Sequence, residues 1–273
     1  MTKFPVGYQV YSARDDAEKD FKGTMKALKE MGYDFVELAG LYGNDAKDIK
    51  AALDEVGIPC YSMHIPFADL MSDLDKQISD ALVIGAKFIV VPYMTEENRP
   101  GVPNYDQVIA NIEKIGKKCR ENGMTLLYHN HDFEFVTMPD GRFGLDVLYA
   151  SVPAEFLQTE IDTCWVHVAG QSPDGYVRKY ANRCPIVHLK DYEGEKSANM
   201  YKLIGIESDK KQAEPSTFRF RPVGYGKQDF NAIIKACQES GAEYIVVEQD
   251  EHYQTPALEC AKMSRDYLRT IGQ

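Results

Sequence analysis

The 273-residue sequence lacks the features that mark several classes of protein. No run approaches the ~20 consecutive apolar residues of a transmembrane helix, so we expect no membrane partner. Residues 1–11 have neither the charged nor the apolar block of a secretion signal, so we expect a cytoplasmic protein. No cluster of basic residues appears, and 31 Lys and Arg against 42 Asp and Glu give a net charge of −11, which argues against nucleic-acid partners.

Cysteine motifs are also missing. The six cysteines are scattered and form no C-x-x-C pair, which excludes a zinc knuckle and a dithiol redox motif. Most of them stand beside apolar residues. We therefore expect buried free thiols rather than disulfides.

The sequence does contain a repeated alternation of short apolar runs and amphipathic stretches. The first strand is expected over Phe4–Tyr11, and single helices are expected over Asp15–Met31 and Leu70–Ile84. Several helical stretches end at Gly or Asn-Gly just before the next apolar run, which is typical of βα units. Runs such as residues 88–91 and 244–247 are apolar throughout, which indicates strands buried on both faces.

Eight such strand–helix pairs favour a closed (β/α)8 barrel over a doubly wound sheet, because no G-x-G-x-x-G follows the first strand. We therefore expect one α/β domain, a TIM barrel over residues 1–273. One connection is long, polar and lysine-rich, at residues 193–221. A βα loop there lies on the C-terminal rim, where it either shapes a pocket or is a surface insertion.

Ionisable residues stand where most of the strands end. In a (β/α)8 barrel these ends meet over one pocket, so residues distant in sequence are expected to converge. The late strands offer two imidazoles and two carboxylates, a set that suits a divalent metal ion. These residues are His129, Asp162, His188 and Glu248. A network of ion pairs without a metal is the alternative.

Five motifs follow one another along the chain. They are Tyr128-His129-Asn130-His131-Asp132-Phe133-Glu134-Phe135, Glu160-Ile161-Asp162-Thr163, His188-Leu189-Lys190-Asp191, Gly224-x-Gly226-x-x-Asp229-Phe230 and Val247-Glu248-Gln249-Asp250. In this order they resemble the xylose-isomerase-like sugar phosphate isomerase/epimerase superfamily, over essentially the whole chain. The resemblance implies one divalent metal ion, Mn²⁺ foremost, with Zn²⁺, Co²⁺, Fe²⁺ or Mg²⁺ as alternatives. It also implies a small sugar or polyol substrate and makes a homo-oligomer possible.

The first metal ligand departs from the family pattern. Three residues match the family's later ligands, namely Asp162, His188 and Glu248, but His129 stands where a Glu is usual. Glu134 is the alternative first ligand. His131 matches a histidine that faces the substrate in relatives.

The resemblance implies a sugar isomerase or epimerase that removes a proton next to a carbonyl, while the metal polarises the carbonyl and holds the enediolate. Glu248 is then the base, and His129 and His131 are the other catalytic candidates. The same groups serve the loss of a β-hydroxyl, so a dehydratase or lyase acting on a keto-inositol or 3-keto-sugar is the alternative. An apurinic endonuclease or a non-catalytic binding protein is a further alternative, and the acidic charge argues against the endonuclease.

Further strand-end residues are candidates for substrate binding, namely His64, Lys190, Trp165, Glu37 and Tyr11. Trp165 replaces a histidine that contacts substrate in ketose epimerases. Lys190 either binds a substrate oxygen or forms an ion pair with Asp191. Glu160 precedes Asp162 by two residues, so the two share a strand face and Glu160 is expected to orient a ligand.

Overall fold

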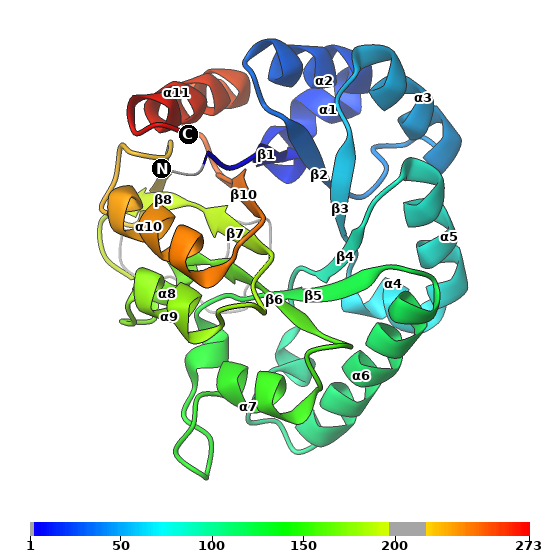
Figure 1. Cartoon of the computed structure of the whole chain (residues 1–273), viewed down its shortest axis with the longest axis vertical. Helices are drawn as coiled ribbons and strands as arrows, with labels where there is room; N and C mark the ends of the chain where they lie inside the picture. The colour runs from blue at the N-terminus through cyan, green and yellow to red at the C-terminus, as the bar shows by residue number, and fades with distance from the viewer. Residues whose placement is uncertain (1–2, 197–216) are drawn as a thin grey trace.

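A closed barrel of eight parallel strands lies at the centre of the computed structural model, which describes residues 3–196 and 217–273 (Figure 1). Each strand pairs with the next along the chain, and the last barrel strand pairs back to the first. The barrel strands are β1 (Val6–Gln9), β2 (Phe35–Ala39), β3 (Cys60–His64), β4 (Phe88–Val91), β5 (Thr125–His129), β6 (Gln158–Asp162), β7 (Ile186–Leu189) and β10 (Tyr244–Val247). The expected (β/α)8 fold is confirmed.

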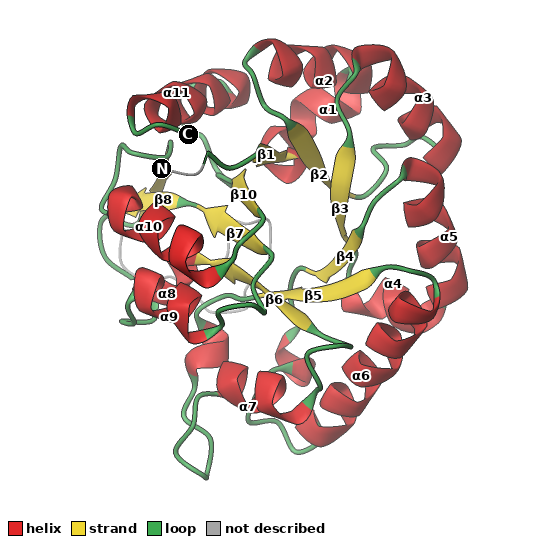
Figure 2. Cartoon of the chain, in the orientation of Figure 1, coloured by secondary structure: helices red, strands yellow, loops and turns green. Residues whose placement is uncertain are grey.

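Helices surround the strands in an outer ring, as Figure 2 shows. They are α1 (Arg14–Lys19), α2 (Phe21–Glu30), α3 (Ala46–Val56), α4 (Phe67–Ser72), α5 (Leu74–Ile84), α6 (Tyr105–Glu121), α7 (Gly144–Ser151), α8 (Thr163–Val168), α9 (Pro173–Lys179), α10 (Phe230–Ser240) and α11 (Ala257–Thr270). Short 3₁₀ helices are η1 (Val10–Ala13), η2 (Glu96–Asn98) and η3 (Phe133–Phe135). Helices α3, α5 and α10 stop at a left-handed glycine, which accounts for the regular helix–Gly–strand pattern.

Two helices expected to be continuous are each broken at an aspartate. Asp20 divides the first into α1 and α2, and its side chain accepts a hydrogen bond from the Gly23 N–H. Asp73 divides the second into α4 and α5 and accepts from the Lys76 N–H. An aspartate side chain satisfies the free N–H groups of a new first turn, so it starts a helix more readily than it continues one.

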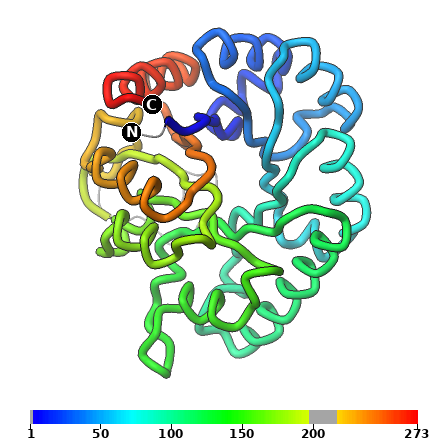
Figure 3. Tube along the Cα trace, in the orientation of Figure 1, coloured from blue at the N-terminus to red at the C-terminus, as the bar shows by residue number. Residues whose placement is uncertain are grey.

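The barrel closes where the beginning and the end of the described chain meet. Val6 pairs with Ile245 in the β1–β10 ladder, and the Phe4 N–H donates to Gln273 Oε1 at 3.0 Å. Figure 3 shows the two ends side by side. The strand expected over residues 4–11 is shorter than predicted, because the chain turns into η1 after Gln9.

Inside the barrel an apolar layer lies beneath a polar one. The apolar layer consists of Phe35, Phe88, Val90, Leu127, Ile186 and Val246, which form one buried cluster. Two residues further along the same strands stand Glu37, His129, His188 and Glu248. Alternate strand residues face the same side, so the step of two places these polar groups above a dry floor.

The long connection after β7 is only partly described. Its two flanks form an antiparallel pair, β8 (Asp191–Glu193) with β9 (Arg219–Arg221). Within the segment expected to be an extended loop, residues 197–216 lie outside the described residues. The pair joins the two flanks of the connection next to Lys190.

One expectation from composition is met in the structure. All six cysteines are free and buried. In residues 3–196 and 217–273, no helix combines the length and apolar character that crossing a membrane requires.

Gly116 lets α6 pack directly against the backbone that precedes β6. A Cβ atom at this position would lie 1.9 Å from the Phe156 carbonyl oxygen. We predict that Gly116→Ala lowers the free energy of unfolding by roughly 1–3 kcal/mol through overpacking, although alanine is the better helix former. Urea unfolding measures the change, with the exposed Lys114→Ala in the same helix as control. A stabilised Gly116→Ala protein would contradict this packing.

Candidate active site

The four predicted metal ligands lie together at the carboxyl end of the barrel. His129 ends β5, Asp162 ends β6, His188 lies in β7 and Glu248 follows β10. One donor atom from each falls within 4.8 Å of the others. His188 Nδ1 is 2.8 Å from Glu248 Oε2, and His129 Nε2 is 3.6 Å from Asp162 Oδ2. All four side chains are buried, with at most 5% of any residue exposed.

The donor set fits a divalent cation. A tetrahedral ion bonded at about 2.1 Å holds its ligands roughly 3.4 Å apart, within the range of separations found here. Asp162 Oδ1 accepts the Cys164 and Trp165 N–H groups at the start of α8, whereas its buried Oδ2 has no hydrogen-bond partner and lies toward His129. A buried carboxylate oxygen without a hydrogen-bond donor needs nearby positive charge, which the Lys190 ammonium at 3.6 Å supplies in part and a bound cation would complete.

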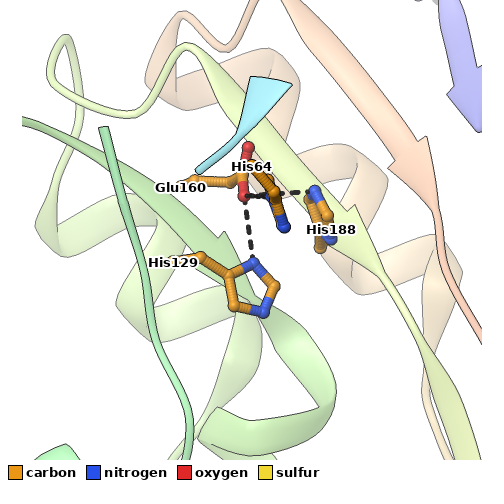
Figure 4. A group of neighbouring side chains, drawn as sticks. All are labelled: His64, His129, Glu160 and His188. Carbon is orange, nitrogen blue, oxygen red and sulfur yellow. Dashed lines mark hydrogen bonds and ion pairs between the residues drawn. The ribbon is translucent and has the colours of Figure 1, made fainter. Parts of the chain in front are cut away.

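A second group of four side chains lies directly beneath the first and is drawn in Figure 4. Its centre is Glu160 Oε2, which lies 2.8 Å from His64 Nε2, 3.0 Å from His129 Nδ1 and 3.3 Å from His188 Nε2. The two groups share His129 and His188. Glu160 therefore directly contacts two of the four predicted metal ligands, His129 and His188.

Glu37 belongs to this lower layer rather than to the substrate cavity. Its carboxylate accepts from Gln9 Nε2 at 2.8 Å and from the Ser62 hydroxyl. The same carboxylate lies 3.0 Å from His64 Nε2 and 2.8 Å from His188 Nε2. Because Glu37 has no exposed surface, the structure places this predicted substrate-binding residue behind the imidazoles.

Lys190 is the cation of the upper layer. Its ammonium lies 2.5 Å from Asp250, 3.4 Å from Glu248 and 3.6 Å from Asp162. Asp191, the alternative partner considered from sequence, instead accepts backbone N–H groups from the Gly224–Gly226 turn. The sequence analysis did not assign Asp250 to the site. Its position two residues after Glu248 could have indicated it, because alternate residues of an extended chain face the same side.

These neighbours set the charges of the carboxyl groups. Burial acts to raise the pKa of Glu248, but Lys190 and His188 outweigh it and hold that pKa well below its usual range. Burial likewise opposes ionisation of Glu160, and the surrounding imidazoles hold its pKa well below the usual range. For Asp250 burial dominates and raises the pKa to about 7.

The basic groups divide into charged and neutral ones. Burial acts to lower the pKa of Lys190, yet the carboxylates around it raise that pKa well above its usual value. Burial is also outweighed at His64, where Glu37 and Glu160 raise the pKa to about 10. In contrast, burial and then the neighbouring His129 lower the pKa of His131, so its imidazole is neutral at pH 7.

A cavity of about 810 Å³ opens above the cluster. Its floor includes His129, Lys190 and Glu248, and its walls include two of the four other predicted substrate-binding residues, Tyr11 and His64. The predicted residues found in the lining are Tyr11, His64, His129, His131, Lys190 and Glu248. Helix α4 adds Phe67 and the exposed Met71, which the sequence analysis missed because it expected one helix that began only at Leu70 and continued to Ile84.

Trp165 and Glu134 have different surroundings from those expected of them. Trp165 is fully buried, and its ring lies 5.1 Å from the His131 ring, so it supports His131 from behind rather than lining the cavity. Glu134 accepts from the Tyr128 hydroxyl at 2.7 Å and from the His131 N–H at 2.8 Å. Of the two candidates for first ligand, His129 is the one that lies in the cluster.

Known proteins resemble this chain over nearly its full length. The inosose dehydratase of Clostridium beijerinckii is 24% identical over 97% of this chain and 94% of its own. A sugar phosphate isomerase/epimerase from Parabacteroides distasonis superposes with a TM-score of 0.76 at 20% identity, covering 99% of this chain and 96% of its own. The probable 3-DHS dehydratase of Bacillus anthracis superposes with a TM-score of 0.76 at 12% identity, covering 98% and 99%.

The family model of the xylose isomerase-like TIM barrel matches residues 25–271. That range includes every strand of the barrel except β1. It also includes the four predicted metal ligands, which we call the upper cluster: His129, Asp162, His188 and Glu248. The chain therefore belongs to the xylose isomerase-like TIM barrel family.

Proposed function

We propose that this protein is a metal-dependent enzyme that removes a proton next to a carbonyl of a sugar or polyol, and that the reaction is a dehydration. The observation that carries the proposal is that the Glu248 carboxylate and the Lys190 ammonium lie 3.4 Å apart and line the same cavity. A base and an acid in one site are what an elimination requires.

The proposed metal site uses His129 Nε2, Asp162 Oδ2, His188 Nδ1 and Glu248 Oε2. Two imidazoles and two carboxylates suit a divalent metal ion, and the family resemblance makes Mn²⁺ the first candidate, ahead of Zn²⁺, Co²⁺, Fe²⁺ or Mg²⁺. When bound, the ion supplies Lewis-acid polarisation of the substrate carbonyl.

Glu248 is the proposed base. It lines the cavity, and its pKa is low enough for it to be ionised at neutral pH. His129 is less suited to proton transfer, because Nδ1 lies against Glu160 and Nε2 faces the metal position. Asp162 is held by two backbone N–H groups. Among the four proposed metal ligands, Glu248 is therefore the one best placed to accept a proton from the substrate.

Lys190 is the proposed acid. Its ammonium lies 3.4 Å from Glu248 Oε2 at the floor of the cavity. The C–H proton goes to Glu248, its electron pair forms the new C=C bond, and the β-hydroxyl leaves as water with a proton from Lys190. His131 is neutral and lines the same cavity. Its imidazole is proposed to accept a hydrogen bond from a substrate hydroxyl or to donate one to it.

The inosose dehydratase relative supports elimination, since its name describes this reaction on a polyol ketone. An isomerase or epimerase is the second candidate. It is favoured by His131, a neutral imidazole in the same cavity that can exchange a proton with the substrate after Glu248 has removed one. A cytoplasmic location and a homo-oligomer stay predictions.

The metal site is tested by Asp162→Asn, which keeps an oxygen for the N–H groups of α8 and replaces the oxygen that faces the cluster. We expect one Mn²⁺ per wild-type chain, and a loss of affinity in the variant at least as large as the roughly 10–100-fold loss caused by outer-shell changes. Isothermal titration with Mn²⁺ measures both. Asp146→Asn, at a carboxylate bonded to Tyr180 on the outer ring, is the matched control. Equal affinity in wild type and Asp162→Asn would remove Asp162 from the site.

The reaction is tested in D₂O with Mn²⁺ and three probes, namely a keto-inositol, a 3-keto-glucoside and a ketose. Dehydration gives a conjugated product and loss of water, whereas isomerisation or epimerisation gives solvent deuterium without loss of water. We expect Glu248→Gln to lower kcat by about 10²–10⁴-fold because it removes the base. Glu113→Gln, on the outer face of α6, is the control. A metal-loaded protein that exchanges no proton with any probe would rule out the proposal.

Lys190→Met tests the ammonium separately from the base. Removing one partner of a buried charge group leaves the others unpaired, so we expect the free energy of unfolding of the metal-free protein to fall by roughly 3–5 kcal/mol. Saturating Mn²⁺ restores part of this loss, because the ion replaces the missing positive charge near Glu248. Thermal unfolding with and without Mn²⁺ gives both values, and Lys235→Met on exposed α10 is the control. A loss that Mn²⁺ leaves unchanged would argue against an ion beside Glu248.

A further inference from the structure

We propose that one side of the cavity is a subsite for an uncharged aryl group, so that the substrate is a sugar or polyol that carries such a group. The inference rests on the proposed function and deepens it by naming the substrate class. It uses six residues that line the cavity without belonging to the upper cluster. We call them the α4 wall, namely Pro66, Phe67, Ala68, Met71, Pro92 and Tyr93.

The α4 wall lies across the barrel from the proposed base and acid. Its residues follow β3 and β4, whereas Lys190 follows β7 and Glu248 follows β10. In the closed strand order, β7 is four strands away from β3 and β10 is four away from β4, so each pair lies on opposite sides of the barrel. A substrate held at Glu248 therefore has the α4 wall opposite it.

The cavity is large for a single sugar ring. Its volume of about 810 Å³ is near the upper end of the roughly 300–1,000 Å³ of pockets that enclose drug-sized ligands. One sugar ring at Glu248 would leave the side of the α4 wall unfilled. The volume thus calls for a substrate with a second group.

Met71 indicates that this second group is apolar. It is 49% exposed, whereas the preceding residue of α4, Leu70, is buried in the core. Of the large apolar side chains that are exposed in residues 3–196 and 217–273, Met71 is the one that lines this cavity. Phe67 precedes it by four residues, so the two share a helix face. Exposed apolar surface in a cavity wall is typical of a ligand-binding groove, and a thioether packs well against an aromatic ring.

Tyr93 gives the wall a fixed aromatic ring. Its hydroxyl accepts a hydrogen bond from the Arg99 guanidinium, and its ring lies 5.1 Å from the His131 ring in edge-to-face contact. Arg99 is itself held, since it donates to the Met94 carbonyl at 3.0 Å and lies 3.9 Å from the centre of the Phe133 ring. A ring that is already held in place loses little freedom when an aryl group packs on it.

The charges of the lining favour an uncharged group over a phosphate or a carboxylate. On the side of the α4 wall, the charged residues of the described lining are Asp69 and Glu97. The positive groups at the opposite side are already paired, because Lys190 contacts three carboxylates and His64 contacts two. An anionic substituent on the side of the α4 wall would therefore face like charge.

The test compares probes that bind without reacting. Phenyl glucoside, methyl glucoside and methyl glucoside 6-phosphate, the first two as both anomers, are titrated into the protein in the presence of Mg²⁺ by calorimetry. We expect one phenyl anomer to bind at least about 10-fold more tightly than its methyl counterpart, because most of a phenyl ring leaves water. We expect the phosphate to add no affinity. The ratio of kcat/KM for phenyl and methyl 3-keto-glucoside gives the same comparison for probes that react.

Met71→Ser tests whether the aryl group lies on the α4 wall. We expect the phenyl preference to fall about 3–10-fold, because apolar contact area is lost, while the affinity for methyl glucoside stays the same. Leu82→Ser is the matched control, since Leu82 is 48% exposed on α5 and does not line the cavity. In protein with ¹³C-labelled methionine methyl groups, the signal that Met71→Ser removes is expected to shift with phenyl glucoside and not with methyl glucoside.

The results separate the subsite from the reaction. Equal affinity for the phenyl and methyl probes, tighter binding of the phosphorylated probe, or a phenyl preference that persists in Met71→Ser without a shift of the Met71 signal would each overturn the inference. Proton exchange with both 3-keto-glucosides at equal kcat/KM would also overturn it and leave the proposed function standing. A phenyl preference in a metal-loaded protein that exchanges no proton with any ketone would overturn the proposed function and support the aryl subsite.

Discussion

The upper half of this barrel depends on the neutralisation of buried negative charge. Four carboxylates, those of Glu37, Glu160, Asp162 and Glu248, lie where water has little or no access. Each would be prohibitively costly alone, so each must meet a cation or several donors. The imidazoles of His64 and His188 and the ammonium of Lys190 meet this need from strands on different sides of the barrel. Each of these positive groups contacts more than one carboxylate. The pairing of the charges therefore depends on the strand register, and the position of the cavity floor depends on both.

Much of this arrangement could be predicted from the sequence, for a simple physical reason. Parallel strands buried on both faces show as unbroken apolar runs, and a polar residue at the end of such a run must lie at the barrel mouth. That argument alone brings His129, Asp162, His188 and Glu248 together, and their donor atoms do lie within 4.8 Å of one another. It also identifies Glu160 as a neighbour of Asp162 through the two-residue strand period.

The roles of the other predicted site residues could not be derived from the sequence. How deep a side chain lies along the barrel axis, and which way it is rotated, leave no pattern in the sequence. Glu37 and His64 were both expected at strand ends, but β2 continues past Glu37 to Ala39 whereas β3 ends at His64, and only His64 reaches the cavity. Trp165 lies on the short helix α8, which is too brief to show a period, and the helix places its ring behind His131. The breaks at Asp20 and Asp73 reflect a competition between capping and helix propagation that propensity alone does not decide.

Asp162 joins two parts of the protein through the two oxygens of one side chain. One oxygen accepts the N–H of Trp165 and the other lies toward the proposed ion, so the proposed ion position and the first turn of α8 share one side chain. Trp165 is the only tryptophan in the chain, and it is fully buried against the His131 ring. The molecule thus contains an intrinsic fluorophore whose backbone N–H is bonded to the proposed metal ligand Asp162, and we expect its emission to respond to a bound ion without an added label.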